Sequence, residues 1–241
     1  MMRHNKWLLI WSISALALLA GSCLVIENQF SGLPPGPWRA VLKLDPVPVT
    51  PNPRGEPLPE KVNLQFDEVT QGELPFNFEV VYDREDRFHI ELINGEERIR
   101  VDDITIGLDR QTAKDTVVID FPVFDSYIRA IFEQNVMEGE WIVRNRENYA
   151  IPFVAYHGQS HRFTTLRKAP VMDLSGRWEA TFEIDTDNPF PAVAEFEQEG
   201  NHLTGTFLTE TGDYRYLEGT VQADKLYLST FDGAHAYLFE A

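Results

Sequence analysis

The chain of 241 residues contains a single cysteine, Cys23. A lone cysteine excludes an intramolecular disulfide, a thiolate zinc site and a Cys-x-x-Cys redox pair within the chain. Basic residues are also scarce, because 21 Lys and Arg stand against 38 Asp and Glu, giving a formal net charge of −17. The sequence has no row of basic residues that could bind phosphate groups. The chain is therefore not expected to bind nucleic acid or to dock on an anionic membrane surface.

Sequence motifs of common enzyme classes are missing as well. The chain has no Gly-x-Ser-x-Gly elbow, no phosphate-binding glycine loop and no His-Glu-x-x-His pair. After the N-terminal segment, no stretch of about eleven residues repeats its apolar positions with the period of a helix. We therefore expect no catalytic residue, metal or cofactor in this chain. The hydrophobic fraction of 43% is nevertheless ample for a folded core.

The N-terminus, residues 1–22, has the features of a signal peptide. Arg3 and Lys6 precede an apolar run that is shorter than the roughly 20 residues of a spanning helix. Small residues then lead to Cys23.

This placement of Cys23 resembles a bacterial lipobox, although Ala20 stands where leucine is usual. The resemblance implies lipidation of Cys23, with residues 23–35 as a tether. The protein would then be a lipoprotein of the bacterial cell envelope that faces the periplasm, and the lipid would be its contact with a membrane.

The remaining sequence predicts an all-β fold of antiparallel meanders. Short runs of alternating apolar and polar residues are separated by turn signals such as Asn94-Gly95 and Asp232-Gly233. A proline-rich loop is expected at 45–59, because proline cannot donate to a strand ladder. Besides a strand opened by Trp38 and those after residue 176, we expect strands at 61–67, 75–83, 86–93, 97–106, 116–121, 126–133, 139–145 and 149–155.

The strands divide into two related units. We expect a first β unit at 36–156, a linker at 157–175 and a second β unit at 176–241, each a small barrel or a sandwich. The repetition rests on four correspondences: 36–38 with 176–178, 75–78 with 191–194, 89–90 with 206–207, and 124–126 with 231–233. The second unit ends before any counterpart of the strand at Trp141. It is therefore expected to be truncated, and the chain to be a fragment of a longer protein.

Three runs in the second unit carry a family resemblance: SGRWEATFE, FEQEGNHLTGTFLTETGDYRYLEG and LYLSTFDGAHAYLFEA. They resemble the region before the thioredoxin domain in TlpA/ResA-like lipoproteins, which are envelope thiol-disulfide oxidoreductases. The resemblance covers roughly residues 36–241, most specifically 174–241. It implies a non-catalytic accessory and tethering role beside a thioredoxin domain or an envelope redox partner. No catalytic residue can be carried over, because the Cys-x-x-Cys pair of that domain has no match in this sequence.

A second hypothesis is a stand-alone barrel that binds a small apolar or sugar-like ligand. Gly-x-Trp opens the first strand of calycin barrels, and the run from Leu203 to Phe207 is similar to one in avidin-like barrels. An interior packed solid would count against this hypothesis. The side chains expected there are Trp178, Phe182, Phe207, Leu228 and Phe239. A hydrolase whose carboxylates cannot be singled out is the third hypothesis.

Few side chains are candidates for chemistry. His157 and His161 are spaced as metal ligands on a helix, but Gly158 between them favours a solvated linker. The acidic pairs Asp102-Asp103 and Asp185 with Asp187 are more typical of polar turns than of a calcium site or a glycosidase. We expect the tryptophans at strand starts to be core side chains rather than a platform for a sugar; these are Trp38, Trp141 and Trp178.

Overall fold

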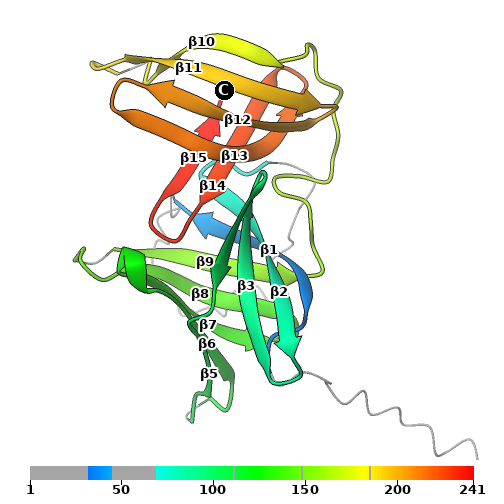
Figure 1. Cartoon of the computed structure of the whole chain (residues 1–241), viewed down its shortest axis with the longest axis vertical. Helices are drawn as coiled ribbons and strands as arrows, with labels where there is room; N and C mark the ends of the chain where they lie inside the picture. Colours follow the sequence, from blue (N-terminus) through cyan, green and yellow to red (C-terminus); the bar gives the residue numbers. More distant parts are fainter. Residues whose placement is uncertain (1–31, 45–68, 111, 148, 185) are drawn as a thin grey trace, which may run out of the picture. The chain divides into compact units, whose positions relative to one another are not determined.

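The computed structural model describes residues 32–44, 69–110, 112–147, 149–184 and 186–241 (Figure 1). These residues form two antiparallel sheets, of nine and six strands, with one 3₁₀ turn at Pro122–Phe124. The predicted all-β fold class is therefore confirmed. Within the described ranges, no helix has the length and apolar character needed to cross a bilayer. The segments predicted to be a signal peptide, a proline-rich loop at 45–59 and a strand at 61–67 lie outside the described residues, as does Cys23.

The nine-stranded sheet is a meander in which the first strand also pairs with the last. Strand β1 lies between β2 and β9, so the two ends of the sheet are β4 and β5. Asp102-Asp103 separates these two strands in the chain, and the single strand expected at 97–106 is therefore two. The strands are β1 (Gly36–Lys43), β2 (Glu73–Arg84), β3 (Arg87–Asn94), β4 (Glu97–Val101), β5 (Ile104–Leu108), β6 (Asp115–Phe121), β7 (Ser126–Glu133), β8 (Val136–Val143) and β9 (Ala150–His157).

The core of this sheet is formed by the side chains on one of its faces. These side chains come from alternate residues of each strand. Trp38 is fully buried, its ring stacked on Phe78 at a centroid distance of 5.7 Å. On the next strand of the sheet, His157 of β9 lies directly opposite Trp38, with the two rings 5.2 Å apart. Trp141 is also buried, so two of the three predicted core tryptophans are confirmed.

The six-stranded sheet is a meander whose neighbours in the sheet are also neighbours in the chain. Its strands are β10 (Gly176–Phe182), β11 (Phe190–Glu199), β12 (His202–Thr209), β13 (Gly212–Gln222), β14 (Lys225–Phe231) and β15 (Ala236–Glu240). Figure 1 shows them as one curved layer, with β10 at one end and β15 at the other. Its apolar face includes Phe196, Phe207 and Leu228.

The first three strands of the two sheets repeat the same local structure. Trp38 Nε1 donates to Pro34 O, and Trp178 Nε1 donates to Leu174 O, in both cases four residues earlier in the chain. The glycines that open these strands have positive φ angles of 101° at Gly36 and 110° at Gly176, which a side chain would disfavour. The next strand follows in the same register, because Val41 pairs with Pro75 and Thr181 pairs with Pro191.

Other expected correspondences are wrong in detail. Strand pairing places Phe207 opposite Ala194 and Leu92 opposite Phe78, so Phe207 corresponds to Leu92 rather than to Ile90. A shift of two residues keeps a side chain on the same face, so the alternating pattern could not reveal the error. Phe124 and Phe231 do not correspond either, since Phe124 is exposed in the 3₁₀ turn and Phe231 is fully buried at the end of β14.

The hairpin of β14 and β15 contributes to both apolar cores. Leu228 on β14 belongs to the core of the second sheet, whereas Phe231 belongs to that of the first. On β15, Phe239 packs in the second core, and Leu238 packs against the first. Successive residues of a strand point to opposite faces, so one hairpin can serve two cores.

A buried arginine in the connection between the sheets forms hydrogen bonds with both of them. Arg162 Nη1 donates to Glu218 Oε2 at 3.0 Å, and Arg162 Nη2 donates to Asn94 Oδ1 at 3.1 Å. Its Nε donates to Ser229 Oγ, which in turn donates to the Pro75 carbonyl. One side chain therefore joins β3 of the first sheet to β13 and β14 of the second. Burial lowers the pKa of Arg162 to about 10, which still leaves it charged at neutral pH.

The other oxygen of Glu218 lies 3.1 Å from His202 Nε2, and this pair makes stability depend on pH. The hydrogen bond to Glu218 raises the pKa of His202 above its ordinary value of 6.5. The resulting stabilisation is complete below that ordinary value and is lost as the pH rises through the raised pKa. His202 is more than half exposed, so solvent screening keeps the effect below about 1 kcal/mol.

We therefore expect His202→Gln to lower the free energy of unfolding at pH 5.5 to 6 and to have little effect near pH 9. The measurement is urea denaturation of both proteins across this range. In a Glu218→Gln background, the same substitution should change the pH profile no further. A loss that is equal at every pH would refute the assigned pair.

Candidate functional site

The concave side of the second sheet holds an aromatic cavity of about 890 Å³. Its lining comes from every strand of that sheet and includes Phe182 on β10, Phe207 on β12, Tyr214 on β13 and Phe239 on β15. The volume lies within the range typical of small-ligand sites. The side chains on this face of the second sheet therefore do not fill the space between them.

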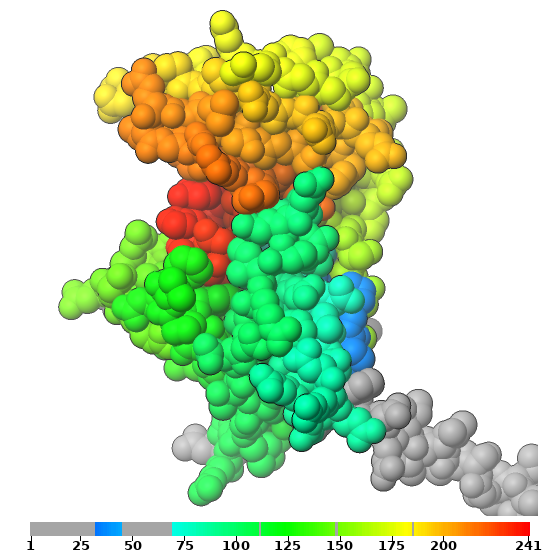
Figure 2. All heavy atoms as spheres, in the orientation of Figure 1, coloured from blue at the N-terminus to red at the C-terminus, as the bar shows by residue number. Residues whose placement is uncertain are grey.

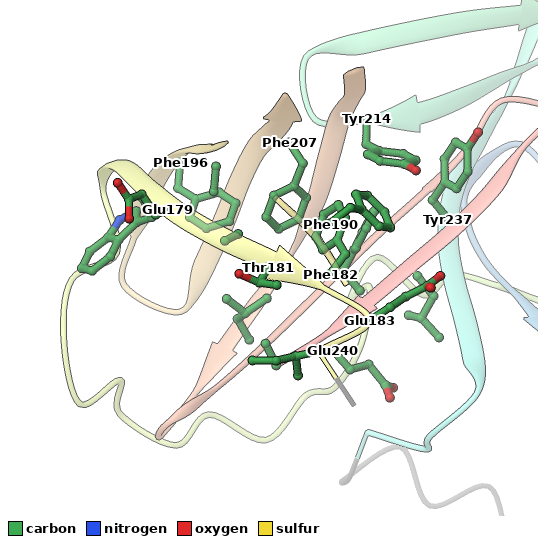
Figure 3. A pocket seen from close by; sticks show the side chains of 18 of the residues that line it. Glu179, Thr181, Phe182, Glu183, Phe190, Phe196, Phe207, Tyr214, Tyr237 and Glu240 are labelled. Atoms are coloured by element: carbon green, nitrogen blue, oxygen red, sulfur yellow. The ribbon is translucent and has the colours of Figure 1, made fainter. Parts of the chain in front are cut away.

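The rings in the cavity contact one another and leave an open side. Phe182 lies 4.9 Å from Phe207 and 5.4 Å from Phe239, measured between ring centroids. Figure 3 shows the rings of Phe182, Phe190 and Phe207 turned toward one another. Trp178 also lines the cavity, yet 38% of its surface is exposed. The expectation that Trp178 is a core side chain is therefore wrong.

Among the described residues that line the cavity, the charged ones are all acidic. They are Glu179 and Glu183 on or just after β10, and Glu240 at the end of β15. Figure 3 shows the carboxylates of Glu183 and Glu240 away from the cluster of rings. No Lys, Arg or His occurs among the lining residues that the structure describes. The cavity therefore combines an apolar interior with a negative rim, which favours apolar groups accompanied by positive charge.

Two strand edges border the cavity. Strand β10 pairs only with β11, and β15 pairs only with β14, within the part of the chain that the structure describes. Ala241 and Leu226 exchange both of their backbone hydrogen bonds. Bonded pairs alternate along antiparallel strands, so the backbone N–H and C=O groups of Leu238 point away from β14. Figure 2 shows the C-terminal residues, in red, at the surface of the molecule.

The two histidines spaced as metal ligands on a helix, His157 and His161, have separate structural roles. His157 is the last residue of β9 rather than part of a solvated linker, and its Nε2 lies 2.9 Å from the Pro35 carbonyl oxygen. Asn77 donates to the carbonyl of His161, and burial lowers the pKa of the His161 side chain to about 4. Among the described residues, no group of three or more His, Cys, Asp and Glu side chains is arranged to hold a metal ion.

Asp102, from the acidic pair Asp102-Asp103, belongs to an exposed ion-pair network. Arg100 donates to Asp102 and to Asp83, and these hydrogen bonds lower the pKa of both carboxyl groups. Lowered values keep the two groups ionised, whereas an acid catalyst needs a pKa raised toward neutrality. Of the other pair, Asp185 lies outside the described residues. The network is therefore structural.

Sequence reasoning named Trp178, Phe182, Phe207 and Phe239 but missed Phe190, Tyr237 and the acidic rim. Tyr237 lies 4.8 Å from Tyr214, ring to ring, although the two residues are on strands that do not pair. No pattern in the nearby sequence predicts a contact between residues on strands that do not pair. The available signal was the alternation of Tyr237 and Phe239 on the last strand, which places both on one face.

Comparisons with protein-family models, curated proteins and solved structures find no match to this chain.

Proposed function

We propose that the protein is a non-catalytic accessory and tethering module of the bacterial cell envelope, anchored by a lipid on Cys23. Its partner is a thioredoxin-type domain of the TlpA/ResA kind, which the second sheet holds in position. The observation that supports docking is the aromatic cavity bordered by the edges of β10 and β15. An unpaired edge beside an apolar groove is a common site of polypeptide docking. The redox nature of the partner is supported by the sequence resemblance.

Photo-cross-linking in the native bacterium tests this proposal. A benzoylphenylalanine replaces Trp178 in the cavity or, as control, Arg215 on β13, which is exposed and follows the inward-facing Tyr214. We expect an adduct from position 178 whose cross-linked peptide belongs to a polypeptide with a Cys-x-x-Cys thioredoxin fold. Equal yields from both positions, or an adduct with a polypeptide lacking that fold, would refute the proposal.

The cavity volume favours a second candidate function, in which the module binds a small apolar or sugar-like ligand. The aromatic lining is suited to such a ligand, and its open side would allow entry. A small ligand would fill the cavity without forming backbone hydrogen bonds along β15. The two functions therefore differ in whether the backbone amide of Leu238 becomes protected from hydrogen exchange, which is measurable.

A further inference from the structure

The two tryptophans that open the sheets have different neighbours on the next strand. Trp38 lies opposite Phe78 of β2, and the two rings stack with their planes 9° apart. Trp178 lies opposite Ala194 of β11, which has no ring to stack on it. Within the part of the chain that the structure describes, no other ring contacts the Trp178 indole. Trp178 and Ala194 both line the aromatic cavity, so the space that a ring fills beside Trp38 is open beside Trp178.

The Trp178 indole is nevertheless held in one orientation. Its Nε1 donates to the Leu174 carbonyl at 2.7 Å, and Leu174 also lines the cavity. Phe196 and Phe207, whose ring centroids lie 5.4 Å apart, line the same cavity from β11 and β12. Trp178 is therefore an aromatic platform that is in place before a ligand arrives, which reduces the entropic cost of binding.

The charge next to this platform is negative. Glu179, which follows Trp178, and Glu183 line the cavity, and no described residue pairs with either carboxylate. The nearest basic residue in the chain, Arg177, is already paired with Glu195 at 3.1 Å. A ligand with positive charge would therefore be attracted to this end of the cavity, and an anion would be repelled.

Ring faces and carboxylates together favour one kind of cation. The face of an aromatic ring attracts positive charge, and tryptophan does so most strongly. The first sheet has such a contact, because the Cζ atom of Arg144 lies 4.6 Å from the centroid of the Tyr127 ring. A primary ammonium group has three N–H donors, which ring faces would leave without good acceptors. A fully alkylated ammonium group has no N–H to satisfy.

We propose that the cavity binds a small molecule in which an alkylated ammonium group is attached to an apolar chain. The ammonium group lies over the Trp178 indole, in the space that corresponds to the Phe78 ring of the first sheet. The apolar chain lies against the rings of Phe207 and Phe239, which contact each other inside the cavity (Figure 3). This inference rests on the second candidate function, the binding of a small ligand, and names the class of that ligand.

Three probes with the same hexyl chain test the charge of the ligand. Hexyltrimethylammonium is positive, hexanesulfonate is negative, and hexyl glucoside is neutral and sugar-like. Isothermal titration calorimetry measures the binding of each probe to the full chain at neutral pH. We expect saturable binding of the ammonium probe, at least roughly 10-fold tighter than that of the other two. Raising the salt concentration from about 0.01 to about 0.15 M should weaken it roughly 2- to 5-fold.

Substitutions at Trp178 and at the acidic rim test where the ammonium group lies. Trp178→Leu keeps an apolar side chain but removes the ring, so it should weaken ammonium binding roughly 10-fold, whereas Trp178→Phe should recover most of that loss. Glu183→Gln should weaken it roughly 2- to 3-fold. Glu197→Gln removes the same charge from the opposite face of the sheet, since Glu197 follows the cavity residue Phe196, and should leave binding unchanged.

A double substitution copies the first sheet. In β2 and β3, Phe78 lies opposite Leu92, whereas Ala194 lies opposite Phe207 in β11 and β12. Ala194→Phe combined with Phe207→Leu reproduces the first arrangement with little change in total volume. The new ring should cover Trp178 and abolish ammonium binding. Near-ultraviolet circular dichroism and the free energy of unfolding establish that this variant is folded.

The outcomes distinguish this inference from the function on which it rests. Tightest binding of hexyl glucoside would overturn the cation site and leave the small-ligand function standing. No saturable binding of any probe would overturn both, and would leave the docking function to the cross-linking experiment. Unchanged ammonium affinity in Trp178→Leu, or in the folded double variant, would place the ammonium group elsewhere and overturn the inference.

Discussion

Replacing Arg162 by methionine should lower the free energy of unfolding by about 3–5 kcal/mol. Its side chain is only 5% exposed and donates to Glu218, Asn94 and Ser229. Methionine fills a similar volume but donates nothing, so the carboxylate of Glu218 stays buried without its charged partner. Burial alone would raise the pKa of Glu218. The hydrogen bond with His202 and the charge of Arg162 lower it instead, so the carboxylate is ionised at neutral pH.

The matched control is Arg100→Met. Arg100 also joins two carboxylates, those of Asp83 and Asp102, but its side chain is 46% exposed. Exposed ion pairs contribute little, so this substitution should cost less than about 1 kcal/mol. Urea denaturation at pH 7 measures both variants. Equal losses would show that Arg162 is no more than a surface ion pair.

The substitution Phe231→Ala should cost about 3–5 kcal/mol of unfolding free energy. The ring is fully buried in the core of the first sheet, although Phe231 is the last residue of a strand in the second. Its centroid lies 4.4 Å from that of Phe76 and 5.2 Å from that of Trp141. Alanine would leave a cavity among rings on three different strands, those of Phe76 on β2, Phe121 on β6 and Trp141 on β8, so the site can collapse only partly.

The control for Phe231 is Phe124→Ala. Phe124 lies in the 3₁₀ turn and is 40% exposed, so its truncation should change the free energy of unfolding by no more than about 0.5 kcal/mol. Thermal unfolding followed by near-ultraviolet circular dichroism compares the two variants. A cost below about 1 kcal/mol for Phe231→Ala would contradict its place in the first core.

Local patterns predicted most strands. The alternation around Asn94-Gly95 located the hairpin of β3 and β4, and the strands expected at 116–121 and 126–133 correspond to β6 and β7. The aromatic residues of the cavity were predicted as interior side chains for the same reason. Arg162 could not be predicted, because its segment has the composition of a loop and its partners lie 56 to 69 residues away in the chain.

The sequence by itself determined the all-β class, the repeated Gly-x-Trp strand opening and the lack of any thiol after Cys23. Each of these depends on residue identity or on contacts within a few residues. Tertiary structure alone decided that Trp38 is buried while Trp178 is exposed beside an open cavity. The two tryptophans have the same hydrogen bond to a carbonyl four residues earlier. Their exposures differ because burial depends on the next strand, and β9 covers Trp38 from more than a hundred residues away in the chain.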